Sequence, residues 1–236
     1  MTKYCIVNGD DFGASRGINR GILEAHQKGI LTSTSLMVNM PEAEEAARLS
    51  REVPLMSIGM HITLTSEDGT PLIDFESPDM CRAEMARQLN RFVDLLGRLP
   101  SHLDSHHNIH RDERLTPLFV EMAERQKVPL REHSQVRYFS EFYGQWDGET
   151  HLEQISVESL CRMLQTEFAE GFTELSCHPG YMDPGYITSY LLERETELQT
   201  ICSPDVRQTF NELGIKLISY NDLVNLSAST DAELIK

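Results

Sequence analysis

Carboxylate and imidazole side chains stand at four separated points of the sequence, each at or just past the end of a predicted strand. These points are Asp10 with Asp11, His61, His106 and His178. Aspartate and histidine bind divalent cations and also serve as general acids and bases. Two adjacent carboxylates repel each other unless a positive charge lies beside them. The residue types therefore indicate a metal-dependent acid–base reaction, provided that the fold brings the four points together.

The densest of these clusters is the segment 104–110, which reads DSHHNIH. Three imidazoles within five residues seldom serve packing, and histidine is the commonest metal ligand. In an extended segment, Asp104 and His106 would point to one side and His107 to the other. Asp104 could then support an imidazole of the site as a hydrogen-bond partner. A spare metal-binding or pH-sensing cluster is the alternative explanation.

Each point has a simpler explanation when it is taken alone. Asp11 could be a turn residue or a helix cap, His61 a buried core histidine, and His178 the start of a turn. Four such residues at four strand ends are harder to explain as packing. One aspartate and two histidines around an ion would leave positions open for water and substrate. This mixed ligand set favours zinc without excluding magnesium.

The elements that must position these side chains alternate along the whole chain. Strands are predicted at 4–7, 30–38, 56–61, 102–106, 128–131, 173–177 and 216–220, and helices at 15–29, 41–49, 85–97, 115–125, 157–168 and 206–213. The alternation predicts an α/β fold with a parallel sheet, and its unit count favours a TIM-barrel-like (β/α) barrel, either complete or with fewer than eight units. A doubly wound sheet has less support, because no GxGxxG motif follows the first strand. We expect a single domain over residues 1–236, with all four points at the carboxyl ends of the strands.

The composition restricts the partners and the compartment. A formal net charge of -16 over 236 residues argues against nucleic acid and against an anionic membrane surface. No apolar run approaches the roughly 20 residues of a membrane span, and the N-terminus leads directly into the first predicted strand. The five cysteines show no CxxC spacing, which favours reduced thiols. We therefore expect a cytoplasmic protein without membrane or nucleic-acid partners.

Two segments near the N-terminus, IVNGDDFG at 6–13 and GILTSTS at 29–35, resemble the YdjC-like carbohydrate deacetylases, the chitooligosaccharide deacetylase family. The resemblance continues in IGMH at 58–61, HLDSHH at 102–107 and CHP at 177–179. It implies a distorted (β/α) barrel, often a homodimer, that uses one divalent metal ion to hydrolyse the acetamide of N-acetylglucosamine units. The implied substrate is a small N-acetylated oligosaccharide such as diacetylchitobiose.

The resemblance also implies roles for individual residues. Asp11, His61 and His106 match the metal ligands of the family. Asp10 matches the general base, and His178 lies in a block near the site. As a hypothesis, Asp10 takes a proton from the attacking water and protonated His178 donates one to the departing amine.

Three further features are open to more than one interpretation. Arg131, after the predicted strand at 128–131, could orient Asp10, hold a substrate oxygen, or pair with Glu132 at the surface. Asn108 stands where the family often carries another histidine. This difference affects the substrate preference expected from the resemblance, but not the expected metal site. Aromatic side chains could form a sugar-stacking wall or only fold a long loop; they are Tyr138, Phe139, Phe142, Tyr143 and Trp146.

Other functions remain compatible with the same residues. A related metallohydrolase could act on another N-acetylated or lipid-linked sugar, and a phosphoesterase would need more Lys and Arg near the motifs than the sequence offers. A non-catalytic sugar-binding relative is a further alternative, although it has no need for Asp10 beside Asp11.

Overall fold

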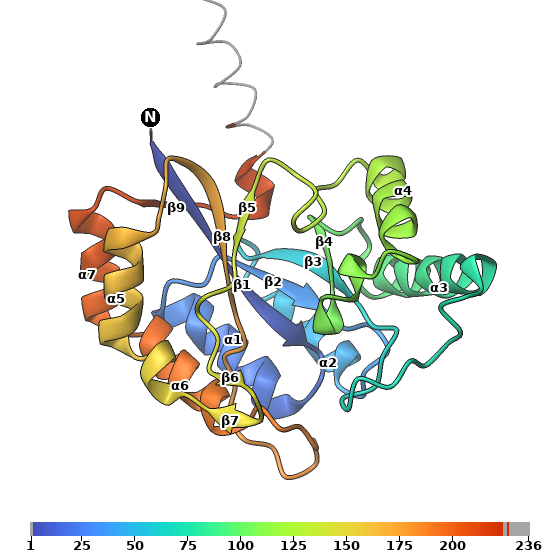
Figure 1. Cartoon of the computed structure of the whole chain (residues 1–236), viewed down its shortest axis with the longest axis horizontal. Helices are drawn as coiled ribbons and strands as arrows, with labels where there is room; N and C mark the ends of the chain where they lie inside the picture. The colour runs from blue at the N-terminus through green and yellow to red at the C-terminus, as the bar shows by residue number, and fades with distance from the viewer. Residues whose placement is uncertain (1, 224–225, 227–236) are drawn as a thin grey trace, which may run out of the picture.

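A parallel sheet of seven strands forms the centre of the computed structural model, which describes residues 2–223 and 226 (Figure 1). Six strands follow the order β4-β3-β2-β1-β8-β5: β4 (Leu103–Ser105), β3 (Ser57–Ile62), β2 (Ser33–Leu36), β1 (Lys3–Phe12), β8 (Gly171–Cys177) and β5 (Arg137–Phe139). A short strand, β9 (Lys216–Leu217), pairs with the start of β1 off this path. The six strands form a parallel half-barrel, so the predicted distorted barrel with fewer than eight units is confirmed.

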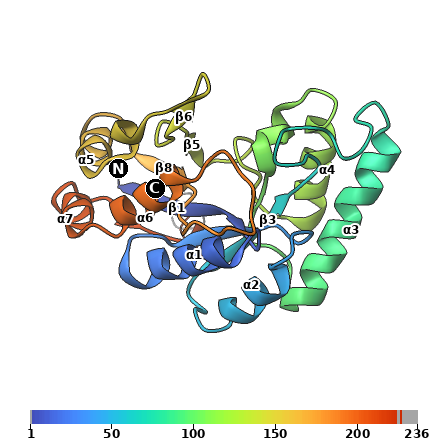
Figure 2. The ribbon, with the colours of Figure 1, turned by 90° about the horizontal axis from the view of Figure 1, so that it is seen from below.

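Helices cover the sheet on its outer side and at both flanks. Figure 2 shows α5 (Val157–Thr166), α6 (Leu192–Ile201) and α7 (Pro204–Glu212) at one flank, α1 (Arg16–Lys28) and α2 (Ala43–Ser50) along the outer side, and α3 (Pro78–Leu96) and α4 (Thr116–Gln126) at the other flank. Smaller elements are the 3-10 helices η1 (His106–Arg111) and η2 (Leu152–Ile155) and the hairpin strands β6 (Gln145–Trp146) and β7 (Glu149–Thr150). None of the helices within residues 2–223 is long and apolar enough to cross a membrane.

Local sequence signals explain how the first unit is built. Ile6 and Val7 of β1 are fully buried, as expected for a central strand of a parallel sheet. The side chain of Ser15 accepts a hydrogen bond from the Ile18 amide and caps α1. At the other end, the Gly29 amide donates to the Ala25 carbonyl and closes the helix. The helix α1 therefore begins and ends where the sequence predicts, whereas β1 extends to Phe12, beyond the strand predicted at 4–7.

Other boundaries differ from the predictions. The strand predicted at 30–38 is limited to β2, and the strand predicted at 128–131 is reduced to an isolated parallel bridge between Leu130 and Leu103. The helix α3 starts at Pro78 rather than at residue 85. The helix α6 was not predicted, because several charged side chains are buried on it and no apolar stripe marks its inner face.

Candidate metal and catalytic site

A β-bulge at the end of β1 places two successive aspartates in the same site. Gly9 pairs with Thr34 and Phe12 with Leu36, so two residues of β1 lie opposite one residue of β2. Successive side chains of a regular strand point to opposite faces, but the bulge removes that alternation. Asp11 accordingly has a φ of 67°. The bulge explains how both neighbouring carboxylates come to line one cavity.

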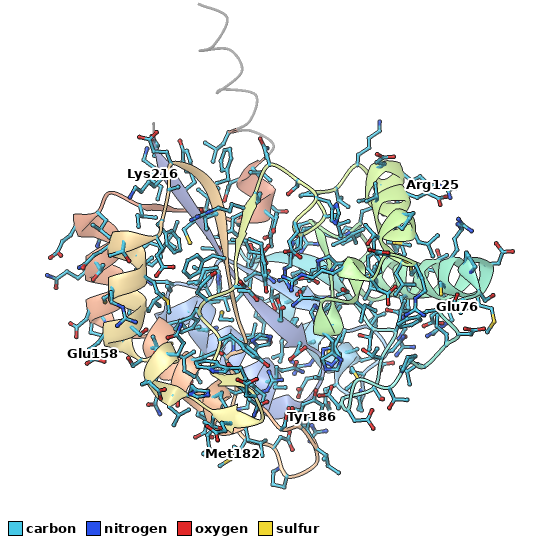
Figure 3. All side chains as sticks on the ribbon, viewed as in Figure 1. Glu76, Arg125, Glu158, Met182, Tyr186 and Lys216 are labelled. Carbon is cyan, nitrogen blue, oxygen red and sulfur yellow. The ribbon has the colours of Figure 1, made fainter. Side chains whose placement is uncertain are left out.

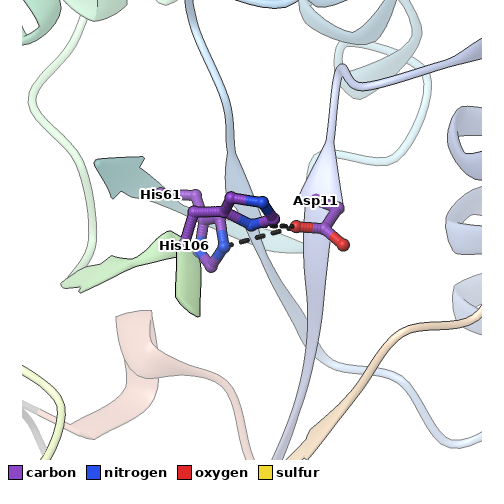
Figure 4. Close-up of side chains that lie close together, drawn as sticks. All are labelled: Asp11, His61 and His106. Atoms are coloured by element: carbon purple, nitrogen blue, oxygen red, sulfur yellow. Dashed lines mark ion pairs between the residues drawn. The ribbon is translucent and has the colours of Figure 1, made fainter. Parts of the chain in front are cut away.

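Asp11, His61 and His106 lie together at the carboxyl ends of the strands (Figure 4). The Asp11 Oδ1 atom is 3.3 Å from His61 Nε2 and 3.2 Å from His106 Nδ1. Ligands at about 2.1 Å from a zinc ion lie roughly 3.4 Å from one another. The Oδ1 atom is also buried and has no hydrogen-bond partner among the described residues. The three side chains therefore fit a divalent cation, as the sequence predicted.

A second grouping of possible ligands fits a cation less well. Asp10, His61 and Asp104 also have ligand atoms close together. In this grouping, however, Arg131 already contacts both carboxylates, at 2.8 Å from Asp10 and 2.9 Å from Asp104. Because a guanidinium occupies the place of the positive charge, no cation is needed there.

The orientation of His61 is fixed by its neighbour across the sheet. His61 of β3 pairs in register with Asp104 of β4, and its Nδ1 atom is 2.8 Å from the Asp104 carboxylate. Burial opposes a charge on the imidazole, but Asp104 and Asp10 raise the pKa of His61 to about 10. A cation must therefore displace a proton from this ring in order to bind. Asp104 supports an imidazole of the site, as its position in the sequence suggested.

His106 reaches the site in a different way from the one expected. The extended segment stops before His106, because β4 ends at Ser105 and the 3-10 helix η1 begins at His106. His107 and Asn108 follow with positive φ angles of 55° and 51°. Such backbone angles are uncommon in side-chain-bearing residues and often occur at functional sites.

Arg131 holds the neighbouring aspartate. Its guanidinium donates two hydrogen bonds of 2.8 Å to the Asp10 carboxylate and further contacts Glu174 at 2.6 Å. Burial disfavours ionisation of Asp10, but Arg131 outweighs it and holds the pKa of Asp10 below its ordinary value. Of the three interpretations of Arg131, the geometry corresponds to orientation of Asp10. Glu132 instead pairs with Arg111.

His178 lies beside the same Asp10 carboxylate that Arg131 holds. Its Nε2 atom is 4.0 Å from Asp10 Oδ2, and its Nδ1 atom is 3.9 Å from Glu197 Oε1. Burial lowers the pKa of His178 to about 4, despite the attraction of Asp10 and Asp11. The resting imidazole is therefore neutral at pH 7, in contrast to the protonated form expected from the sequence.

Several side chains of the site were missed by the sequence analysis. Arg194 of α6 donates a 2.6 Å hydrogen bond to Asp11 Oδ2, and Glu197 of the same helix accepts from the His178 amide. Glu67, in the loop before α3, lies 3.3 Å from His106 Nε2. None of these residues belongs to a motif or to an apolar periodicity, so only the fold reveals them.

The site opens into a cavity of about 440 Å³. Besides the residues predicted for the site, its wall includes aromatic and polar side chains: Tyr138, Phe142, Tyr143, Tyr190, Asn108 and Arg111. Of the other aromatic residues considered, Phe139 is buried in the core and Trp146 stacks on His151. A larger cavity, beside Tyr4 and Lys216, lies at the amino-terminal end of β1 and contains none of the predicted site residues.

Known proteins are similar to this chain in sequence and in fold. The family model described as YdjC-like protein matches residues 4–212. A carbohydrate deacetylase from Geobacillus stearothermophilus is 37% identical, with 96% of this chain and 100% of the relative covered. A chitooligosaccharide deacetylase from Proteus mirabilis is 32% identical, with 95% and 100% covered. The chain belongs to the YdjC-like family, and the predicted membership of this family of enzymes is confirmed.

Solved structures share the fold of this chain. A structure from Enterococcus faecalis V583, described as a cellobiose-phosphate cleavage protein, has a TM-score of 0.80 and 27% identity, with 94% of this chain and 99% of that chain covered. A family 4 carbohydrate esterase from Streptomyces lividans has a TM-score of 0.57 and 13% identity, with 92% and 91% covered. The second similarity concerns the fold alone and supports the distorted barrel.

Proposed function

We propose that this protein is a metal-dependent hydrolase that removes the acetyl group from N-acetylglucosamine units of a small oligosaccharide, such as diacetylchitobiose. The observation that carries the proposal is the position of Asp11, His61 and His106, buried at one end of a cavity and directly beside Asp10. The names of the two full-length relatives support the choice of an N-acetylated sugar.

The proposed ligands are Asp11, His61 and His106. When bound, a divalent cation supplies Lewis acidity, which lowers the pKa of a water molecule and polarises an amide carbonyl. Zinc suits the mixed nitrogen and oxygen ligands, and magnesium remains an alternative. Arg194 neutralises the second oxygen of Asp11, which keeps that carboxylate turned toward the two imidazoles.

Asp10 is the proposed general base. Arg131 holds its carboxylate ionised and in a fixed orientation, so it is ready to accept a proton from the attacking water. Neutral His178 is the proposed carrier of a proton to the leaving amine. Since its Nε2 atom lies 4.0 Å from Asp10, a small movement would bring the two groups within hydrogen-bond distance. In this scheme His178 is charged only during turnover.

A phosphoesterase with the same ligands is the competing proposal. Arg111 and Arg194 line the cavity, but Arg111 pairs with Glu132 and Arg194 with Asp11. A phosphate group would have to compete with Glu132 for Arg111 and with Asp11 for the Nη2 atom of Arg194. The pairing favours a neutral substrate such as an acetamide.

The decisive experiment measures acetate release from diacetylchitobiose with added Zn²⁺ or Mg²⁺, against an EDTA-treated control. We expect acetate only with the metal. Phosphate release from a panel of phosphoesters, without acetate from any N-acetylated sugar, would overturn the proposal.

We also propose that the protein is cytoplasmic and forms a homodimer. Cell fractionation would test the compartment, and light scattering would test the oligomeric state.

A further inference from the structure

The loop between β3 and α3 brings a carboxylate to the outer side of His106. Glu67 lies on this loop, and its Oε1 atom is 3.3 Å from His106 Nε2. Among the described residues, it is the only carboxylate within ion-pair distance of that nitrogen, which is shielded from solvent. A turn holds the loop at this point, since the Ser66 amide donates to the Thr70 carbonyl and Thr65 forms a bridge with Pro71.

A second loop holds the same carboxylate. The hydroxyl of Tyr186 donates a short hydrogen bond to Glu67 Oε1. Tyr186 lies in the segment between β8 and α6, 119 residues away from Glu67 in sequence. Figure 3 shows Tyr186 on this segment, at the lower edge of the molecule. Glu67 therefore joins the two loops while it contacts His106.

The two imidazoles of the site are arranged alike. His61 directs Nε2 to Asp11 and Nδ1 to Asp104, whereas His106 directs Nδ1 to Asp11 and Nε2 to Glu67. In protein metal sites, the nitrogen that does not bind the metal usually donates its proton to a carboxylate, carbonyl or water. That contact fixes the tautomer and the orientation of the ring. Asp104 is hydrogen-bonded to His61 in this position. Glu67 stands in the corresponding position for His106, 3.3 Å from its Nε2 atom, which is buried and has no hydrogen-bond partner among the described residues.

We propose that Glu67 is a positioning residue for the metal site and that Tyr186 anchors it. By accepting the Nε2 proton of His106, Glu67 leaves the lone pair of Nδ1 facing the cation. Because Tyr186 holds Glu67, metal affinity depends on the loop between β8 and α6. The inference rests on the proposed metal site, but it is independent of the identity of the sugar.

Direct ligation by Glu67 is the alternative. It would require a cation between Nε2 of His106 and the Glu67 carboxylate, on the side of the ring away from Asp11. The Oδ1 atom of Asp11 and the Nε2 atom of His61, which lie near Nδ1 of His106, could not then bind the same ion. The nitrogen of His106 that binds the metal therefore distinguishes the two arrangements.

The first experiment measures the affinity of the protein for Zn²⁺ by competition with a chromophoric chelator, without any sugar. We expect Glu67→Ala to weaken binding about 10–100-fold, the usual range for such supporting residues. Glu67→Gln keeps an acceptor oxygen and should retain most of the affinity, and Tyr186→Phe should fall between wild type and Glu67→Ala. Glu76→Gln is the matched control, since Glu76 is on the same loop but its carboxylate pairs with Arg114 at the surface, away from His106. It should bind Zn²⁺ like wild type.

The second experiment reads the histidine tautomers by long-range ¹H–¹⁵N correlation in the Zn²⁺-loaded protein. In wild type, His106 should carry its proton on Nε2, and Glu67→Ala should broaden or shift this signal while that of His61 stays unchanged. Wild-type affinity in both Glu67→Ala and Tyr186→Phe, or a His106 proton on Nδ1, would overturn the inference. If wild type binds no divalent cation, the proposed function fails with it. If Zn²⁺ binds but no acetate is released, only the proposed reaction fails.

Discussion

Strands build one half of the site and loops build the other. Asp11, His61 and Asp104 lie on β1, β3 and β4, and each is at most 2% exposed. Glu67 and Tyr186 come from two loops and are partly exposed. A strand end is held by the sheet on both sides, whereas a loop depends on a few contacts of its own. The strand half therefore holds its charged side chains in fixed positions. The loop half contacts them from outside, through Glu67 and Tyr186.

The strongest test of this comparison removes a ligand from the strand half. His61→Ala should lose both bound metal and activity, because two remaining ligands leave a weak and incomplete site. Tyr143→Phe, which changes a cavity residue of the loop half, should keep stoichiometric metal. Elemental analysis of both purified proteins gives the answer. Stoichiometric metal in His61→Ala would show that the ligand assignment is wrong.

A second test separates the chemistry of the strand half from its metal binding. Asp10→Asn should lower kcat by about 10²–10⁴-fold, the usual contribution of a general base, while Zn²⁺ still binds. The amide can accept one hydrogen bond from Arg131 but cannot take a proton from water. Acetate release and metal content would be measured on the same preparation. Unchanged kcat would exclude Asp10 as the base and leave neutral His178 as the alternative.

The sequence revealed the strand half of the site and missed most of the loop half. Asp11 and His61 follow apolar strands, and parallel strands bring their carboxyl ends to one edge, so their proximity was predictable. Neither Glu67 nor Arg194 has a comparable signal, because a charged residue in a loop or on a helix usually faces solvent. The bulge at Asp10 and Asp11 was also hidden, since it depends on pairing with β2. The neutral state of His178 depends on burial, which is a property of the folded chain.

Buried and exposed arginines should also differ in what they contribute to fold stability. Arg131 is almost fully buried and contacts Asp10, Asp104 and Glu174. Arg131→Met would leave these carboxylates buried without their counter-charge and should lower the free energy of unfolding by about 3–5 kcal/mol. Arg114→Met, at the surface in the α3–α4 region, should lower it by less than about 1 kcal/mol. Urea denaturation would measure both values, and equal losses would contradict the distinction.

The smallest predicted effect concerns a histidine that supports η1 behind the cavity. The His110 ring contacts Ser105 Oγ at 2.7 Å and Glu132 Oε2 at 3.0 Å, and burial, with a contribution from Arg131, lowers the pKa of His110 to about 4. The unfolded chain, with an ordinary pKa near 6.5, therefore binds this proton more readily than the folded one. The stabilising contribution is present above pH 6.5 and decreases as the pH falls from about 6.5 to about 4.

This linkage can be isolated with a variant that does not titrate. Between pH 7 and pH 5, wild type should lose about 1–2 kcal/mol more of its free energy of unfolding than His110→Gln, which cannot take up the proton. Urea denaturation at both pH values would show the difference, with wild type and variant compared within each buffer. An equal loss in both proteins would mean that the pKa of His110 is the same in the folded and the unfolded chain, which contradicts the prediction. A smaller loss in wild type than in the variant would mean that folding raises the pKa of His110 and that its contact with Glu132 is a charged pair. In that case the buried His110 would be paired with an opposite charge, as Asp10 is paired with Arg131 in the site.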